Sequence, residues 1–134
     1  MKNSISTTLA VLLFMYCAFS SCNKTNSPTL TGGKGGKATL LISPEHHGFY
    51  VDSCMIYIKY AATDKPANNI YDDSSKCILN DTIPVATFKQ LKTGQYYIYG
   101  YGYHATYNQI VFGGLPVSIN IEDSQTVYLP TFNQ

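Results

Sequence analysis

Three histidines are the side chains of this sequence with the clearest capacity to bind a metal ion. His46 and His47 are adjacent, and His104 follows much later in the chain. Neutral imidazoles beside the carboxylates of Glu45 and Asp52 could ligate zinc or copper. Neighbouring side chains on an extended chain point in opposite directions, however, so His46 and His47 would not readily reach one ion. A plain hairpin accounts for the segment, and we expect no metal and no other cofactor.

The remaining polar side chains do not form a recognisable catalytic arrangement. No Gly-x-Ser-x-Gly elbow and no Cys-His signature surrounds a nucleophile. Asp64, Asp72 and Asp73 lack the ligand spacing and the glutamate of an EF-hand calcium loop. Solvated loop carboxylates are the commoner case, so the sequence predicts that this chain is not an enzyme.

The segment 96–104 has the most unusual composition, since it reads Tyr-Tyr-Ile-Tyr-Gly-Tyr-Gly-Tyr-His. Alternate residues of a strand share a face, and on one face this segment would carry Tyr97, Tyr99, Tyr101 and Tyr103. An outward-facing row would form an aromatic strip suited to contact with a protein or a glycan. Half-buried tyrosine is common in β-sandwiches, so we favour the interpretation that the row lies in the core or at its rim.

The charge balance argues against nucleic acid as a partner. The 134 residues include nine Lys and Arg and eight Asp and Glu, for a formal net charge of +1. No basic residue is an arginine, the side chain best suited to bidentate contact with phosphate, and no basic stripe is present. Tyrosine occurs twelve times and tryptophan not at all, and this composition favours a β-rich fold.

The N-terminus has the pattern of an export signal. An apolar run over 9–19 has the length of a signal-peptide core and falls short of the ~20 residues of a membrane-spanning helix. The Phe-Ser-Ser-Cys segment at 19–22 then resembles the lipobox of bacterial lipoproteins, where leucine usually stands in place of the phenylalanine. The resemblance implies cleavage before Cys22 and a diacylglycerol group on its thiol, and two acyl chains suffice for a stable membrane anchor. The alternative is an ordinary secretory signal that leaves Cys22 as a free thiol.

Cleavage at that point divides the chain into three parts. These are a signal peptide over 1–21, the lipidated Cys22 with a Gly-, Ser- and Thr-rich tether over 22–36, and one domain over 37–134. A flexible tether of ~14 residues would hold the domain about 20 Å from its anchor.

The two cysteines of the domain are candidates for a disulfide. If Cys22 is acylated, Cys54 and Cys77 remain as an even pair in an oxidising compartment. A bridge between them would close a loop of ~23 residues and stabilise the fold by on the order of 3 kcal/mol. The alternative is a pair of separate buried thiols.

Apolar residues of the domain recur with a period of two or in short runs, and turn residues separate the runs. The predicted strands are 37–43, 53–62, 77–79, 84–91, 95–104, 115–121 and 126–132. No segment has convincing helical periodicity. We therefore expect an all-β fold, a single small antiparallel β-sandwich of about seven strands.

One segment carries a more specific pattern, Phe-x-x-Leu-x-x-Gly-x-Tyr over 88–96. It resembles the signature of prealbumin-like (transthyretin-like) sandwiches, which include the carboxypeptidase regulatory-like modules. The resemblance implies that Phe88 and Leu91 are core residues and that Gly94 makes a tight turn into the next strand. The whole arrangement of Gly-rich tether, His-His-Gly turn and Asp-Ser-Cys strand is also similar to small lipoproteins of Bacteroidetes, and that similarity implies a fold and a location but no activity.

These features together predict a non-catalytic, membrane-anchored lipoprotein of the bacterial cell envelope, with the outer membrane favoured and either the periplasm or the surface as the facing side. Its expected role is that of a binding or accessory module with a protein or glycan ligand. The alternative is a structural or assembly subunit of a surface appendage or envelope complex, which would pair with its partner at the edge of the sandwich.

Overall fold

The computed structural model describes residues 31–133, and all regular structure in this range is β-strand. The signal peptide, Cys22 and most of the predicted tether lie outside the described residues. Residues 34–36, which were expected to end the tether, belong to the first strand. The strands are β1 (Lys34–His46), β2 (Phe49–Tyr50), β3 (Ser53–Tyr60), β4 (Asp73–Lys76), β5 (Ile78–Asn80), β6 (Ile83–Leu91), β7 (Gly94–His104), β8 (Gln109–Ile119), β9 (Ser124–Pro130) and β10 (Phe132–Asn133).

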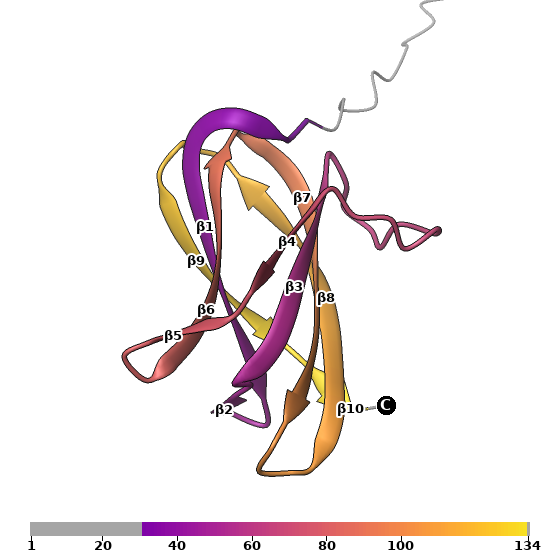
Figure 1. Ribbon diagram of the computed structural model, residues 1–134. Helices are drawn as coiled ribbons and strands as arrows, with labels where there is room; N and C mark the ends of the chain where they lie inside the picture. Colours follow the sequence, from indigo (N-terminus) through magenta and orange to yellow (C-terminus); the bar gives the residue numbers. More distant parts are fainter. Residues whose placement is uncertain (1–30, 134) are drawn as a thin grey trace, which may run out of the picture.

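The strands form two sheets that pack face to face (Figure 1). In sheet I, β1 lies between β9 and β6, β5 continues beyond β6, and β2 pairs with the end of β1. Sheet II has the order β10-β8-β7-β3-β4. The prediction of an all-β sandwich is confirmed. One pairing departs from the antiparallel pattern, since β1 and β9 run parallel from Thr39↔Ser124 to Glu45↔Pro130.

Strict alternation along the central strands places one face of each sheet in a common core. The fully buried side chains include Leu40 and Ile42 of sheet I and Ile56, Ile58 and Ile98 of sheet II. Apolar side chains from facing sheets exclude water from one another, which is the main favourable contribution to folding. The core therefore joins the two sheets, and the alternate side chains of the central strands point to the outer faces.

Three strands were not expected at their observed positions, and the shortest of them is β2 (Phe49–Tyr50). β4 has the polar sequence Asp-Ser-Ser-Lys and lies in a stretch that was predicted as loop. It is an edge strand that pairs only with β3, so backbone hydrogen bonds rather than burial account for it. β8 begins at Gln109, earlier than predicted, and contains Gly113, Gly114 and Pro116, which look like turn residues in the sequence.

The Phe-x-x-Leu-x-x-Gly-x-Tyr segment occupies the positions that the resemblance implied. Phe88 and Leu91 are buried on β6, and Gly94 begins β7 with φ +149°. A Cβ at Gly94 would lie 2.1 Å from the carbonyl oxygen of Thr31. Glycine is therefore required here both for its backbone conformation and for the close approach of the chain.

Tyr96 completes this segment and fastens the start of the domain to the sandwich. Its ring is fully buried. Its hydroxyl accepts a hydrogen bond from the Gly33 N–H (2.9 Å) and lies 2.6 Å from the carbonyl oxygen of Lys92, to which it donates. One side chain thus satisfies backbone groups of two segments that would otherwise be unpaired.

We expect Tyr96→Phe to lower the free energy of unfolding by about 1–3 kcal/mol, because it leaves the buried N–H of Gly33 and the partly buried carbonyl of Lys92 without their partner. The midpoint of urea unfolding measures the effect. Tyr128→Phe is the matched control, since Tyr128 is 54% exposed on β9, and it should change the midpoint little. Equal midpoints for the two variants would contradict this role of the hydroxyl.

Candidate functional site

The four tyrosines in the row on β7, Tyr97, Tyr99, Tyr101 and Tyr103, lie on the outer face of sheet II. The intervening residues Tyr96, Ile98, Gly100 and Gly102 are buried, whereas Tyr97 and Tyr99 are half-buried and Tyr101 and Tyr103 are exposed. The favoured interpretation placed the row in the core or at its rim; none of the four side chains lies in the core, and Tyr101 and Tyr103 are exposed. The glycines explain the outcome, since a Cβ at Gly100 would lie 2.6 Å from Leu129 Cδ2 and one at Gly102 would lie 2.4 Å from the Ser53 carbonyl oxygen. The glycine face, and not the tyrosine face, has neighbours too close for side chains.

The loop between β3 and β4 covers the half of the row that contains Tyr99. Tyr71 from this loop stacks on Tyr99 with ring centroids 5.9 Å apart and an interplanar angle of 17°. The Nζ atom of Lys65 lies 4.9 Å from the centroid of the Tyr99 ring, a cation–π arrangement. Burial raises the pKa of Tyr71 to about 12, and its hydroxyl is buried without a hydrogen-bond partner. This half of the row is occupied by the chain itself.

The other half is open, and we call it the aromatic patch. It consists of side chains that lie side by side on β3, β7, β8 and β10, as their register shows. Phe132 is 63% exposed, Tyr101 47%, Ile110 43% and Tyr103 42%. A hollow of about 550 Å³ lies within the patch and has Lys76 of β4 on its border. The members of the aromatic patch are Met55, Tyr101, Tyr103, Ile110, Phe112 and Phe132.

The charged side chains on the outward positions of sheet II are of one sign. The outward positions of the five strands of sheet II include Lys59 and Lys76 but no carboxylate. Lys59 forms an ion pair with Asp72 of the loop at 2.9 Å. Lys76 forms no ion pair with any residue of 31–133. Lys76 is therefore an unneutralised positive charge at the border of the patch.

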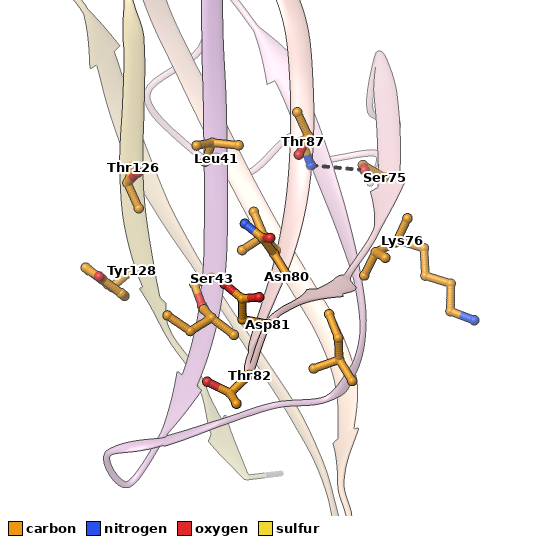
Figure 2. A pocket seen from close by; sticks show the side chains of 14 residues that line it. Leu41, Ser43, Ser75, Lys76, Asn80, Asp81, Thr82, Thr87, Thr126 and Tyr128 are labelled. Atoms are coloured by element: carbon orange, nitrogen blue, oxygen red, sulfur yellow. Dashed lines mark hydrogen bonds between the residues drawn. The ribbon is translucent and has the colours of Figure 1, made fainter.

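A second, larger hollow of about 720 Å³ lies on the outer face of sheet I (Figure 2). Leu41 contributes to it from β1, and Thr126 and Tyr128 line it from β9. On the opposite side, the backbone N–H of Thr87 donates a hydrogen bond to Ser75 Oγ at 3.3 Å and so links β6 to β4. Most of its polar lining consists of hydroxyl and amide groups, a set suited to a neutral polar ligand. Its lining residues are Leu41, Ser43, Ser75, Lys76, Ile78, Leu79, Asn80, Asp81, Thr82, Ile83, Val85, Thr87, Thr126 and Tyr128.

The three histidines gather at one end of the sandwich, where the ends of β1 and β7 meet. His46 Nδ1 and His104 Nδ1 are 3.1 Å apart, so one of them donates a hydrogen bond and the other accepts it. The His47 ring lies 4.2 Å from the His46 ring. The expectation that these adjacent rings diverge was wrong, because His47 has φ +53° and leaves the strand. His104 is distant in the sequence but joins the other two histidines, since the sandwich brings the ends of β1 and β7 together.

Two of the three histidines, His46 and His104, are closed to solvent, whereas His47 is exposed. His46 and His104 are 2% and 3% exposed, and the ring of Tyr107 lies 5.5 Å from His46 and 4.9 Å from His104. Burial, followed by the charges that His47 and His104 carry when protonated, lowers the pKa of His46. Within residues 31–133, no group of three or more His, Cys, Asp or Glu side chains is placed to hold a metal ion.

Cys54 and Cys77 lie opposite one another and are free thiols, both buried. The predicted lipid-bearing residue, Cys22, lies outside the described residues. The part of the chain that the structure describes contains no helix that could span a membrane.

Comparison with known proteins identifies no relative of this chain. No protein-family model matches the chain, and no match was found among curated proteins or solved structures. The aromatic patch and its positive border are therefore the basis for a functional conclusion.

Proposed function

We propose that this chain is a non-catalytic binding module of the bacterial cell envelope, which holds a protein partner on the aromatic patch. The observation that carries the proposal is the exposure of Tyr101, Tyr103, Ile110 and Phe132 side by side on one sheet face. Aromatic side chains and methionine are enriched in the buried centres of protein interfaces, and carboxylates are depleted there. The tyrosines also offer hydroxyls at the margin of an apolar surface.

The charge beside the patch defines the partner further. Lys76 borders the hollow of the patch and is not neutralised by any described residue. Complementary charges fix orientation and raise the association rate more than they raise affinity. We therefore propose a partner that presents an apolar segment with Asp or Glu beside it.

The proposed location rests on the N-terminal sequence. A diacylated Cys22 would anchor the chain in a membrane, with the outer membrane favoured and the periplasm or the surface as the facing side. The prealbumin-like assignment is part of the same proposal, and the buried positions of Phe88, Leu91 and Tyr96 support it.

The test compares two substitutions on opposite faces. Arrays of peptides that combine aromatic and acidic residues are probed with the unchanged protein, with a Tyr101→Ala/Tyr103→Ala variant and with Tyr128→Ala. Truncation of central interface tyrosines often costs 2 kcal/mol or more each, so we expect the double variant to bind at least about 30-fold more weakly. Tyr128 is similarly exposed but lies on sheet I, so Tyr128→Ala should bind as the unchanged protein does.

Other outcomes would point elsewhere. Binding to a glycan array with the same dependence on Tyr101 and Tyr103 would show that the aromatic patch is the binding site but that its ligand is a glycan and not a protein. Self-association that neither tyrosine variant changes would favour the assembly role, for which the edge of β9 that faces away from β1 is available. Peptide binding that is equally strong in all three proteins would rule out the aromatic patch.

A further inference from the structure

Cys54 and Cys77 occupy directly opposed positions of an antiparallel pair. Met55 of β3 is the register partner of Lys76 of β4, so the next opposed pair is Cys54 and Cys77. The Cys77 N–H donates a hydrogen bond to the Cys54 carbonyl oxygen at 2.9 Å. Opposed residues that exchange such bonds have Cα atoms about 5.5 Å apart. This is within the roughly 4.4–6.8 Å that a disulfide requires.

The two side chains also point to the same side of the strands. Cys54 is 3% exposed and Cys77 5% exposed, and both belong to the core. The side chains contact each other: a hydrogen bond with Cys77 and then burial raise the pKa of the Cys54 thiol, while the same hydrogen bond lowers the pKa of the Cys77 thiol. Cys77 is therefore the thiol that ionises first, and the thiolate is the form that reacts.

We propose that Cys54 and Cys77 are a modification site, at which oxidation forms one intramolecular disulfide that fastens β4 to β3. In the reaction with a low-molecular-weight disulfide, the first cysteine thiolate attacks a reagent sulfur and releases one reagent thiol. The second cysteine thiolate then attacks the mixed disulfide and releases the other reagent thiol. The protein loses two protons and two electrons, and the reagent disulfide is reduced to two thiols.

The surroundings give the reagent a route to the pair. Cys77 directly follows β4, an edge strand of four residues with β3 as its one neighbour in the sheet. Short edge strands open at low cost in free energy, because few contacts hold them.

The bridge would act on both outer faces of the sandwich. It closes a loop that includes Lys65 and Tyr71, the residues that cover Tyr99. It also restrains Lys76, which lines the hollow of the aromatic patch and the hollow on sheet I. The oxidised protein should therefore hold its two surfaces more rigidly than the reduced protein does.

Peptide mapping tests the bond directly on the unchanged full chain. The protein is incubated with oxidised glutathione or with dithiothreitol, denatured, alkylated with iodoacetamide and digested with trypsin. Cleavage after lysine places Cys54 in peptide 38–59 and Cys77 in peptide 77–89, separated by peptide 60–76. After oxidation we expect these two peptides to be linked in monomeric protein, and after reduction we expect both to be alkylated.

The result that overturns the proposal is separate peptides after oxidation, each alkylated or each carrying glutathione. Thermal unfolding supplies a second measurement. A bridge across a loop of this size should raise Tm by about 10–20 °C in a domain of this length. The same oxidation should leave the Tm of a Cys54→Ser/Cys77→Ser variant unchanged. Linked peptides without any rise in Tm would show that the bond strains the folded structure and does not fasten β4 to β3 in its native position, and this would also overturn the proposal.

Discussion

Replacing Gly94 by alanine is expected to lower the free energy of unfolding by about 3–5 kcal/mol, a large fraction of the stability of a domain of this size. Two effects add at this position. The φ of +149° disfavours any side chain. The new Cβ would also lie 2.1 Å from the carbonyl oxygen of Thr31 and 2.4 Å from its carbonyl carbon. These are backbone atoms, so the chain itself must shift, and Gln95 would lose its hydrogen bond to Thr31.

Gly48→Ala is the matched control for this prediction. Gly48 also has a positive φ, +78°, but a Cβ there would meet no atom within 4 Å. It should therefore show only the backbone effect, about 1–2 kcal/mol. Urea unfolding of the two variants separates the conformational strain from the steric clash. Equal losses in both variants would show that the approach of Thr31 to Gly94 has no energetic consequence.

Lowering the pH from 7 to 5 is expected to destabilise the protein through the histidine cluster. The pKa of His46 is lower in the folded protein than its ordinary value of 6.5. Between these two values the unfolded chain binds more protons than the folded chain, so stability falls as the pH falls. The stabilising contribution is complete above pH 6.5 and is lost progressively as the pH drops through 6.5 towards the lower pKa of the folded state.

Unfolding midpoints in urea at pH 5, 6, 7 and 8 measure this effect, and His46→Gln is the informative variant. Its amide does not titrate, so its midpoint should change over this range by less than half as much as that of the unchanged protein. The carboxylates do not obscure the result. The pKa of Asp73, for example, is lowered from 3.8, first by its hydrogen bond with Lys34, so its contribution is lost only at lower pH. Parallel pH profiles for the two proteins would exclude His46 as the responsible group.

Local patterns in the sequence predicted the parts of the fold that depend on neighbouring residues. The alternation along β7 correctly divided its residues into two faces. The resemblance carried by Phe88, Leu91, Gly94 and Tyr96 correctly implied that Phe88 and Leu91 are core residues and that the chain turns before β7. The two faces of β7 follow from strand periodicity, which acts over a few residues.

Features that depend on distant residues could not be predicted in this way. The contact between His46 and His104 joins residues 58 positions apart and arises only when the two sheets pack. Which face of β7 lies inward was also undetermined by the alternation. Gly100 and Gly102 carried the missing signal, because close packing on their face leaves no room for side chains.

The start of β8 was predicted too late in the sequence for a related reason, which concerns its two glycines. They look like a turn in the sequence, but each allows a close approach in the structure. A Cβ at Gly113 would lie 2.0 Å from the carbonyl oxygen of Pro130, and one at Gly114 would lie 2.3 Å from the hydroxyl oxygen of Tyr97. The partner atoms belong to β9 and β7, and no local pattern around residue 113 identifies them.

The direction of the strands has a mechanical consequence. The described chain begins at one end of the sandwich, and the aromatic patch extends to the end where β10 lies (Figure 1). If Cys22 is anchored and a partner pulls on the patch, the force acts along the strands. Hydrogen bonds between strands lie across this direction, so the ladders that join β1 to β6 and β9 would be loaded in shear. In this geometry many hydrogen bonds would share the load at once. We therefore expect the domain to withstand a larger force than it would if the strands were separated one hydrogen bond at a time.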